Sequence, residues 1–550
     1  MNRRAAWPAI VLAASLLLTA LVYAPTVGYG FYYDDYHFVR PYTGREIAHA
    51  FHGPWDPAAI ETAYYRPLTI CLYAARFALL GVNAHAYHLT SLALFALAAA
   101  LFAVFTTRAS GSRVAGALGA AAFIVHPGMP YAAVAWVTNQ MHLAELVVVL
   151  TGFLWWFHVR ARPLAWWLPL LALQAAALLI KEDGIMLIPA VVVLHILRKS
   201  LVERELPHVP LGFLVAAAVV IGGLLGIRGS ALQGSPSHRL PSLDQAWTNW
   251  TRGLGGAFRL LPAKRPWQTA ASRFVTVVPI LALLSWRRIS HGARFTLLAG
   301  AAIGVLFVLP FAFIIKGEQM HLVNAGAALL LAASLAGLLE AVAARRLAGV
   351  AVLGAALGGL AAMALVARDI MRDFEPYGPI VLHTDRMVEG WAAVPLEWRE
   401  YLTAKRTAAA AERPDPDPSR GVPLVAFGLH GREHDADGVA LRWMAGPVAD
   451  VFVRRGTRLV SFQARHERGA FGEPAHLRIE ADGAEVIETV IDDGRWHRFD
   501  IALKQRAWIG AGGTHRLRIA IDHAWIPAAI IAGSNDRRTL GLQIGEFDVR

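Results

Sequence analysis

Hydrophobic and polar positions divide the chain into two regions. Up to about residue 367, long apolar runs alternate with short polar turns, and most runs approach the roughly 20 residues that a membrane-spanning helix needs. This pattern predicts eleven spans, at 7–27, 85–107, 114–130, 136–157, 164–180, 184–198, 210–227, 271–286, 294–314, 321–341 and 347–367. The apolar stretch 66–81 is brief and carries Arg76, so we expect a helix that lies in the membrane interface.

The pattern changes after residue 367. Residues 368–420 form a connecting segment that contains a Pro-rich linker at 412–418, which favours an extended chain. Apolar and polar residues then alternate in 448–466, 475–491, 495–503 and 515–522, and Asp482-Gly483 between two such runs is typical of a hairpin. We therefore expect residues 421–550 to form an all-β sandwich.

Composition supports a membrane protein. Of the 550 residues, 56% are hydrophobic and 17% are charged, against a usual charged share of about 25%. Only 13 of the 40 acidic residues lie in 1–367. These values exclude a disordered chain and argue against an ordinary soluble enzyme, and the single cysteine, Cys71, excludes a disulfide-built protein. The net charge of +12 therefore does not point to nucleic acid, which we do not expect as a partner.

Basic residues predict the orientation. Arginines or lysines precede the first predicted span and follow the second, fourth, sixth, eighth and tenth. The N-terminus is therefore expected in the cytoplasm and the β-sandwich outside. Residues 228–273 depart from this rule, because this external loop holds seven basic residues. We expect the first span to be an uncleaved anchor, and the protein to be a multi-pass protein of a bacterial plasma (inner) membrane with its active side and C-terminal domain extracytoplasmic.

Two adjacent carboxylates are the sharpest chemical feature. Asp34 and Asp35 follow the first span in the external loop 28–84, beside Tyr36 and His37. A carboxylate near apolar surface and a second carboxylate has a reason for a raised pKa, which suits a general base that deprotonates a hydroxyl. A solvated loop or a helix N-cap would also explain the pair.

Further polar residues fall at the same predicted side. Arg66 could bind a phosphate or anchor the chain at the interface, and Lys181 could meet a lipid phosphate or pair with Glu182. Asn139, His142 and Glu145 share one helix face by their spacing. Ionisable groups at membrane depth are functional candidates, and the candidates for substrate binding are Tyr36, His37, His126, Asn139, His142, Glu145, Glu182 and His321.

The order of these motifs carries a family resemblance. The Asp pair, "YRPL" at 65–68, "YHL" at 87–89, "HP…VAWV" from His126, and "KE" before "LIP" together resemble the membrane glycosyltransferases of the GT-C superfamily, with the protein O-mannosyltransferase-like bacterial branch as the nearest group. Two positions depart from that pattern. Gln319 and Met320 stand where relatives often have an Arg-Tyr pair, and Asn139-Gln140 stands where relatives often have an arginine.

The resemblance implies an inverting transfer of a sugar from a polyprenyl-phosphate donor. Asp34 or Asp35 would be the catalytic base, and Arg66 and Lys181 would bind the donor phosphate. The acceptor would be a hydroxyl of a protein, a glycan or a lipid. The C-terminal sandwich resembles the carbohydrate-binding modules of some bacterial membrane glycosyltransferases, and Trp443, Trp496 and Trp525 could form a sugar platform or simply core.

Several alternatives stay open at this stage. A transporter or flippase of a lipid-linked glycan would more often show internal repeats and spans broken by Gly or Pro, and we see no repeat. A non-catalytic relative that binds glycan is the other alternative. The sequence predicts no definite cofactor other than the lipid-linked sugar donor. A divalent metal is left open, although the spacing of His and Glu matches no known ligand pattern. The oligomeric state is not predicted.

Overall fold

The computed structural model describes most of the chain outside the connecting segment. The described residues are 6–29, 35–56, 64–81, 83–129, 136–160, 162–232, 242–258, 266–312, 321–343, 345–372, 425–435, 438–454, 457–467, 473–503, 514–531, 533–536 and 538–550. The chain divides into two compact units. One comprises Met1–Tyr29, Tyr42–Leu72 and His88–Glu375, and the other comprises Gly30–Pro41, Tyr73–Tyr87 and Pro376–Arg550.

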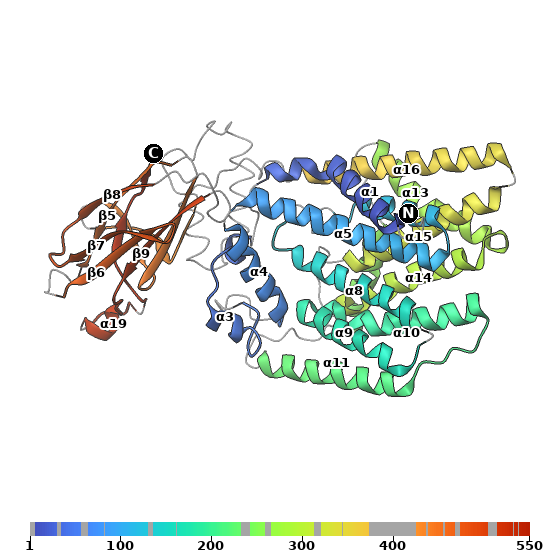
Figure 1. The fold of residues 1–550 in the computed structure, drawn as a ribbon, viewed down its shortest axis with the longest axis horizontal. Helices are drawn as coiled ribbons and strands as arrows, with labels where there is room; N and C mark the ends of the chain where they lie inside the picture. The colour runs from blue at the N-terminus through green and yellow to red at the C-terminus, as the bar shows by residue number, and fades with distance from the viewer. Residues whose placement is uncertain are drawn as a thin grey trace. The chain divides into compact units, whose positions relative to one another are not determined.

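The first unit is helical (Figure 1). Its α-helices, some of which continue into the second unit, are α1 (Ala6–Tyr23), α3 (Gly44–His49), α4 (Pro67–Leu80), α5 (Ala84–Ser110), α6 (Arg113–Val125), α8 (Gln140–Val159), α9 (Leu168–Ile180), α10 (Leu187–Arg198), α11 (Leu211–Ala231), α12 (Leu243–Phe258), α13 (Pro266–Leu284), α14 (His291–Val308), α15 (His321–Val342) and α16 (Arg346–Arg372). Single helical turns connect them: η1 (Ala24–Gly28), η2 (Leu164–Trp167), η3 (Glu182–Met186), η4 (Lys199–Glu203), η5 (Trp286–Arg288) and η6 (Leu309–Ala312).

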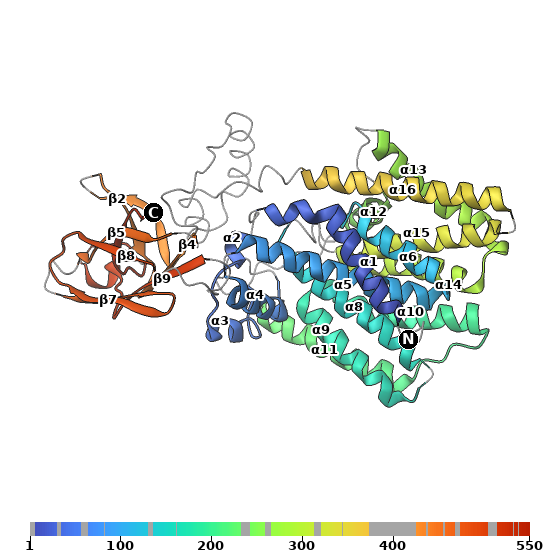
Figure 2. The ribbon, with the colours of Figure 1, turned by 45° about the horizontal axis from the view of Figure 1, so that its top comes forward.

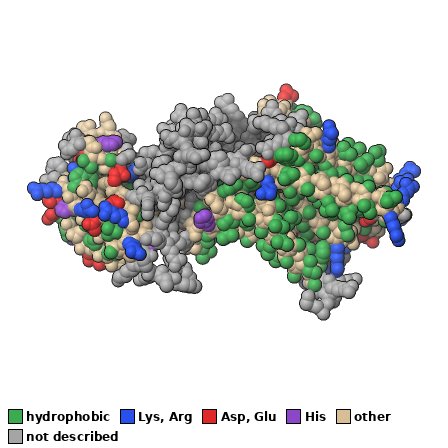
Figure 3. Space-filling model, turned by 90° about the horizontal axis from the view of Figure 1, so that it is seen from above, with side chains coloured by type: hydrophobic (Ala, Val, Ile, Leu, Met, Phe, Trp, Pro, Cys, Tyr) green, Lys and Arg blue, Asp and Glu red, His purple; other side chains and the backbone are tan. Residues whose placement is uncertain are grey.

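Each of the eleven predicted spans coincides with a helix. In the described residues, nine helices are long and apolar enough to cross a membrane. The other two, α6 and α9, have 13 residues each, fewer than the roughly 20 that span a bilayer. Hydrophobic side chains cover much of the helical part of the face in Figure 3, as expected of a surface that meets lipid. The prediction of a polytopic α-helical membrane protein is confirmed.

Helix α15 forms the centre of this bundle. In its most apolar window 89% of residues are buried, compared with 11% in α11. It packs against α14, α6, α13 and α16. Helix α11 runs along the edge of the bundle in both ribbon views (Figures 1 and 2) and packs against α9. The apolar surface of α11 therefore faces lipid over most of its circumference.

Helix α12 lies within the basic stretch 228–273, where the hydropathy pattern predicts no element. It is strongly amphipathic, and it packs against η6, α14 and α15. Trp247 and Trp250 stack on its surface with ring centroids 5.1 Å apart, and Trp247 is exposed. An amphipathic helix with exposed aromatic residues fits a membrane–water interface.

The C-terminal region is an antiparallel β-sandwich, as predicted. Its strands are β1 (Val425–Phe427), β2 (Leu429–His434), β3 (Ala440–Met444), β4 (Val448–Arg454), β5 (Leu459–Arg465), β6 (Ala475–Ala481), β7 (Ala484–Ile491), β8 (His497–Ala502), β9 (Thr514–Ile521), β10 (Gln543–Gly545) and β11 (Asp548–Val549). One sheet has the order β1-β4-β9-β6-β7. The other has the order β11-β5-β10-β3-β2, with β8 also paired to β5. The short helix α19 (Pro527–Ile530) precedes β10.

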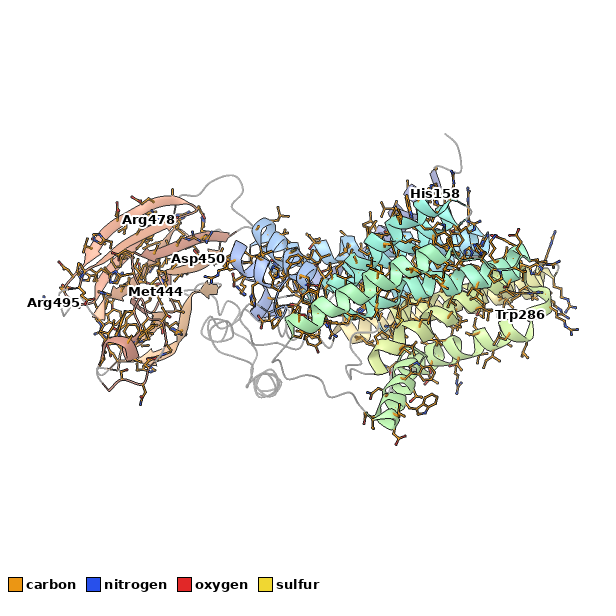
Figure 4. The ribbon with its side chains drawn as sticks, turned by 90° about the horizontal axis from the view of Figure 1, so that it is seen from below. His158, Trp286, Met444, Asp450, Arg478 and Arg495 are labelled. Atoms are coloured by element: carbon orange, nitrogen blue, oxygen red, sulfur yellow. The ribbon has the colours of Figure 1, made fainter. Side chains whose placement is uncertain are left out.

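Alternating residues of both sheets form the core of the sandwich. Val451 and Leu517 come from one sheet, Phe462 and Ile544 from the other, and Met444 is fully buried among them (Figure 4). The predicted hairpin joins β6 and β7, with positive φ angles at Asp482 (51°) and Gly483 (79°). Two successive residues with positive φ are what a tight two-residue hairpin turn requires.

Candidate functional site

A sharp corner between α9 and α10 positions the charged residues of the "KEDG" segment. Helix α9 ends at Ile180, Lys181 is extended, and η3 follows directly. The buried side chain of Gln174 holds this corner, because its amide donates to the Gly184 carbonyl (2.8 Å) and accepts from the Ile188 backbone N–H (2.9 Å). A Cβ atom at Gly184 would lie 2.4 Å from the Ala177 backbone. The close approach of corner and helix therefore requires glycine.

Arg66 and Glu182 form a buried ion pair across 116 residues of sequence. Nε and Nη2 of Arg66 donate to the Glu182 carboxylate, and the shortest contact is 2.7 Å. The guanidinium lies over the rings of Tyr64 (4.1 Å) and Trp55 (4.9 Å), and only 2% of the Arg66 side chain is exposed. Planar stacking and a two-point contact suit arginine and hold the guanidinium in one orientation.

A second ion pair lies next to the first. Lys181 Nζ is 2.6 Å from Oδ1 of Asp183, and both side chains are almost fully buried. The suggestion that Lys181 pairs with Glu182 is thus wrong. The backbone at Lys181 is extended (φ −159°, ψ 153°), and the helical turn η3 begins at the next residue. Asp183, which the sequence analysis did not select, is the residue that neutralises this lysine.

The first turns of α8 bring a third carboxyl and an imidazole to the same place. Glu145 lies beside Asp183 and within electrostatic reach of Lys181, and its Oε1 has no hydrogen-bond partner among the described residues. His142, one turn before Glu145, stacks on His321 with ring centroids 4.4 Å apart. Neither ring nitrogen of His142 has a hydrogen-bond partner in the described part of the chain. All three side chains are buried.

The remaining polar candidates of the first unit are also buried, at helix ends. His126 follows α6, and its Nδ1 accepts from the Gly128 backbone N–H (3.2 Å). Asn324 on α15 donates to the carbonyl of the same glycine (3.0 Å). Asn139 precedes α8, and its Nδ2 has no hydrogen-bond partner within the described ranges. The structure thus brings Arg66, Lys181, Glu182, Glu145, His142 and His321 into one cluster with Asp183, which we call the charged cluster.

Asp35 belongs to the second unit. It begins the short helix α2 (Asp35–Phe38) and is fully buried. The charge of Arg76 lies within its electrostatic reach. Burial lowers the pKa of Arg76 to about 10, and the neighbouring carboxylate of Asp35 opposes that change. The arginine thus stays charged at neutral pH, and Asp35 has a cation nearby. Asp34 and the side chains of Tyr36 and His37 lie outside the described residues.

The tryptophans of the sandwich divide between core and surface. Trp443 and Trp525 are buried and meet edge to face at 6.1 Å, within a small core that also contains Leu441 and Leu540. Trp496 is partly buried against this core, and the guanidinium of Arg465 lies 4.7 Å from its ring. Core packing therefore accounts for two of the three rings that could have formed a sugar platform.

Sequence reasoning missed the residues that hold the charged cluster in place. Asp183, Gln174, Tyr64 and Trp55 contribute contacts that depend on the folded arrangement. The aromatic residues near Arg66 in the sequence could have indicated Tyr64 and Trp55 as its contacts, since arginine stacks on aromatic faces. In the described part of the chain no three His, Cys, Asp or Glu side chains are grouped so that they could hold a metal ion.

No family model matches the chain, and no curated protein matches it. Among solved structures, the chain is similar to the arabinosyltransferase EmbB from Mycobacterium smegmatis, with 13% sequence identity and a TM-score of 0.36. The alignment covers 99% of this chain and 64% of that protein, so the chain spans less than two thirds of the length of EmbB.

Proposed function

We propose that the protein is an inverting glycosyltransferase that transfers a sugar from a polyprenyl-phosphate donor to an extracytoplasmic hydroxyl. The observation that carries the proposal is the charged cluster, which places two cations and three carboxyls at the end of an apolar helical bundle. Burying so many ionisable groups at membrane depth is costly, and such groups usually serve a function.

The polar atoms of the cluster that have no partner support a binding role. Oε1 of Glu145 and both ring nitrogens of His142 are buried without hydrogen-bond partners in the described residues, and buried polar groups in proteins are normally satisfied. Sugar hydroxyls both donate and accept hydrogen bonds and would satisfy these atoms. In this proposal His142, Glu145 and His321 contact the sugar, with Asn139 and His126 beside them.

The chemical step needs a base and a stabilised leaving group. Asp34 or Asp35 takes the proton of the acceptor hydroxyl, the acceptor oxygen attacks the anomeric carbon, and the bond from that carbon to the phosphate oxygen breaks. The electron pair leaves with the polyprenyl phosphate, and the configuration at the anomeric carbon inverts. Arg66 and Lys181 lie beside the departing phosphate, since fixed cations stabilise negative charge that develops there.

Both partners of these cations have a positioning role. Glu182 holds Arg66 and Asp183 holds Lys181, so neither cation must reorganise when the donor binds. The active side and the sandwich are proposed to be extracytoplasmic, as the distribution of basic residues predicts. The sugar could be a hexose, as in the O-mannosyltransferase-like branch, or a pentose.

The test is release of polyprenyl phosphate by purified full-length protein in nanodiscs of native lipid. A panel of polyprenyl-phosphate hexoses and pentoses is offered with a crude cell-envelope acceptor fraction, and the anomeric configuration of the product is read by NMR. We expect release from one donor class with inversion. Movement of an intact donor across a liposome membrane without cleavage would instead establish a transporter, and retention of configuration would overturn the proposed single displacement.

A further inference from the structure

Arg228 lies close to the charged cluster although it comes from a different helix. It stands in the last turn of α11, and α11 packs against α9, the helix that leads into Lys181. Its charge reaches the carboxylate of Glu182. The residues of α11 that are buried or half-buried include Phe213, Ala217, Leu224 and Arg228, whose spacing of roughly one helical turn places them on one face. Arg228 therefore continues the face that packs on the bundle.

The charge balance of the cluster makes this arginine important. Arg66 is matched by Glu182 and Lys181 by Asp183, so these four residues contribute no net charge. Glu145 adds a further carboxyl. A phosphate would therefore meet little net positive charge from the residues of the two ion pairs. Arg228 supplies an additional cation, and in the described residues its Nε has no hydrogen-bond partner.

The position of Arg228 also suits a ligand that arrives from the bilayer. Helix α11 is at the edge of the bundle (Figures 1 and 2), and most of its other residues are exposed, among them Val215, Val219, Leu225 and Ile227. A lipid chain beside this helix would stay in an apolar environment while its head group reached the last turn. Such an arrangement fits an amphiphile with a phosphate head.

We propose that Arg228 binds the phosphate of the polyprenyl-phosphate donor and supplies the positive charge that the two internal ion pairs leave missing. The inference rests on the proposed function, and it goes beyond it by assigning a residue of α11. Arg66 and Lys181 stay beside the phosphate as the hydrogen-bond donors of two fixed ion pairs, while Arg228 is the cation whose charge the phosphate neutralises on binding.

Equilibrium binding of radiolabelled decaprenyl phosphate to the full chain in nanodiscs tests this assignment. Arg228→Gln removes the charge, Arg228→Lys keeps it without the planar fork, and Arg45→Gln removes an exposed charge of the external helix α3 as a matched control. Because a hydrogen bond to a charged group contributes about 1.5–3 kcal/mol, we expect Arg228→Gln to raise Kd about 10- to 100-fold. Arg228→Lys should fall between, and Arg45→Gln should stay within about twofold of wild type, as surface charges contribute little.

Competitors distinguish the source of the phosphate. Inorganic phosphate and phosphatidylglycerol are added to separate samples at the concentration of decaprenyl phosphate, and the proposal expects neither to displace it. Displacement by phosphatidylglycerol would reveal a general anionic-lipid site and overturn the assignment. Equal affinity of wild type and Arg228→Gln, with donor turnover intact in both, would overturn the role of Arg228 while leaving the glycosyltransferase standing. Absence of decaprenyl phosphate binding to wild type would overturn both.

Discussion

Replacing Glu182 by Gln removes one charge of the buried pair and keeps its shape. The contact of 2.7 Å between Arg66 Nη2 and Glu182 Oε2 corresponds to a gross attraction of about 6 kcal/mol at an effective dielectric constant of about 20. Desolvation of both ions offsets much of that attraction. The variant, however, leaves the arginine charge buried without its partner, and breaking a buried pair in this way costs about 3–5 kcal/mol.

The free energy of unfolding can be measured by titrating SDS into the protein in dodecylmaltoside micelles. We expect Glu182→Gln to lower it by about 3 kcal/mol, at the lower end of the range because Glu182 is 12% exposed and Arg66 keeps its contacts with Tyr64 and Trp55. The double variant Arg66→Met/Glu182→Gln should be more stable than the sum of the two single changes predicts, with a coupling of about 2 kcal/mol.

Glu205→Gln is the matched control for this experiment. Glu205 also forms a short ion pair, with its Oε2 2.6 Å from Lys199 Nζ, but its side chain is 62% exposed. Exposed pairs contribute about 0–1 kcal/mol, so this control should change stability little. Glu182→Gln could lower the free energy of unfolding no more than Glu205→Gln does, or the two changes in the double variant could simply add. Either result would show that the Arg66–Glu182 pair does not organise the charged cluster.

Three further changes test other parts of the structure. Gly184→Ala places a Cβ 2.4 Å from α9 backbone and should destabilise by about 1–3 kcal/mol in the same SDS titration, whereas Gly222→Ala, with open space around it, should not. Gln174→Leu leaves two backbone groups of the corner unsatisfied and should cost about 2 kcal/mol or more, and an unchanged titration would contradict our description of the corner. Asp450→Asn should increase hydrogen exchange in β4 and β9 at neutral pH. Burial raises the pKa of Asp450, but hydrogen bonds from two arginines lower it overall. The contribution of the Asp450 carboxylate to stability is therefore present above about pH 4 and is lost as the pH falls through the lowered pKa. Equal exchange in wild type and variant at neutral pH would contradict this role of Asp450.

Elements whose pattern is local could be predicted from the sequence. Apolar runs located eleven helices because helix burial in lipid depends on continuous hydrophobicity, and the Asp482-Gly483 turn was visible because few residue pairs accept two positive φ angles. Helix α12 was not visible, since its apolar residues repeat with the helical period among polar ones and its mean hydropathy is low. A search for period rather than hydropathy would have found it.

The pairing within the charged cluster could not be predicted in the same way. Arg66 and Glu182 are 116 residues apart, and their contact depends on the packing of whole helices. Lys181 pairs with Asp183 rather than with its neighbour Glu182, whose carboxylate pairs with the distant Arg66. The sequence indicated which ionisable residues were candidates for a functional site. Only the fold determines which carboxylate neutralises which cation.

The central claim is sugar transfer that depends on an aspartate of the first external loop. The most direct measurement is single-turnover release of polyprenyl phosphate by wild type, Asp34→Asn and Asp35→Asn, each shown by SDS titration to be folded and by decaprenyl phosphate binding to retain its lipid site. We predict that one Asn variant loses about 100-fold or more of the rate, the usual contribution of a general base, at unchanged lipid affinity. Equal rates in all three proteins would contradict the account.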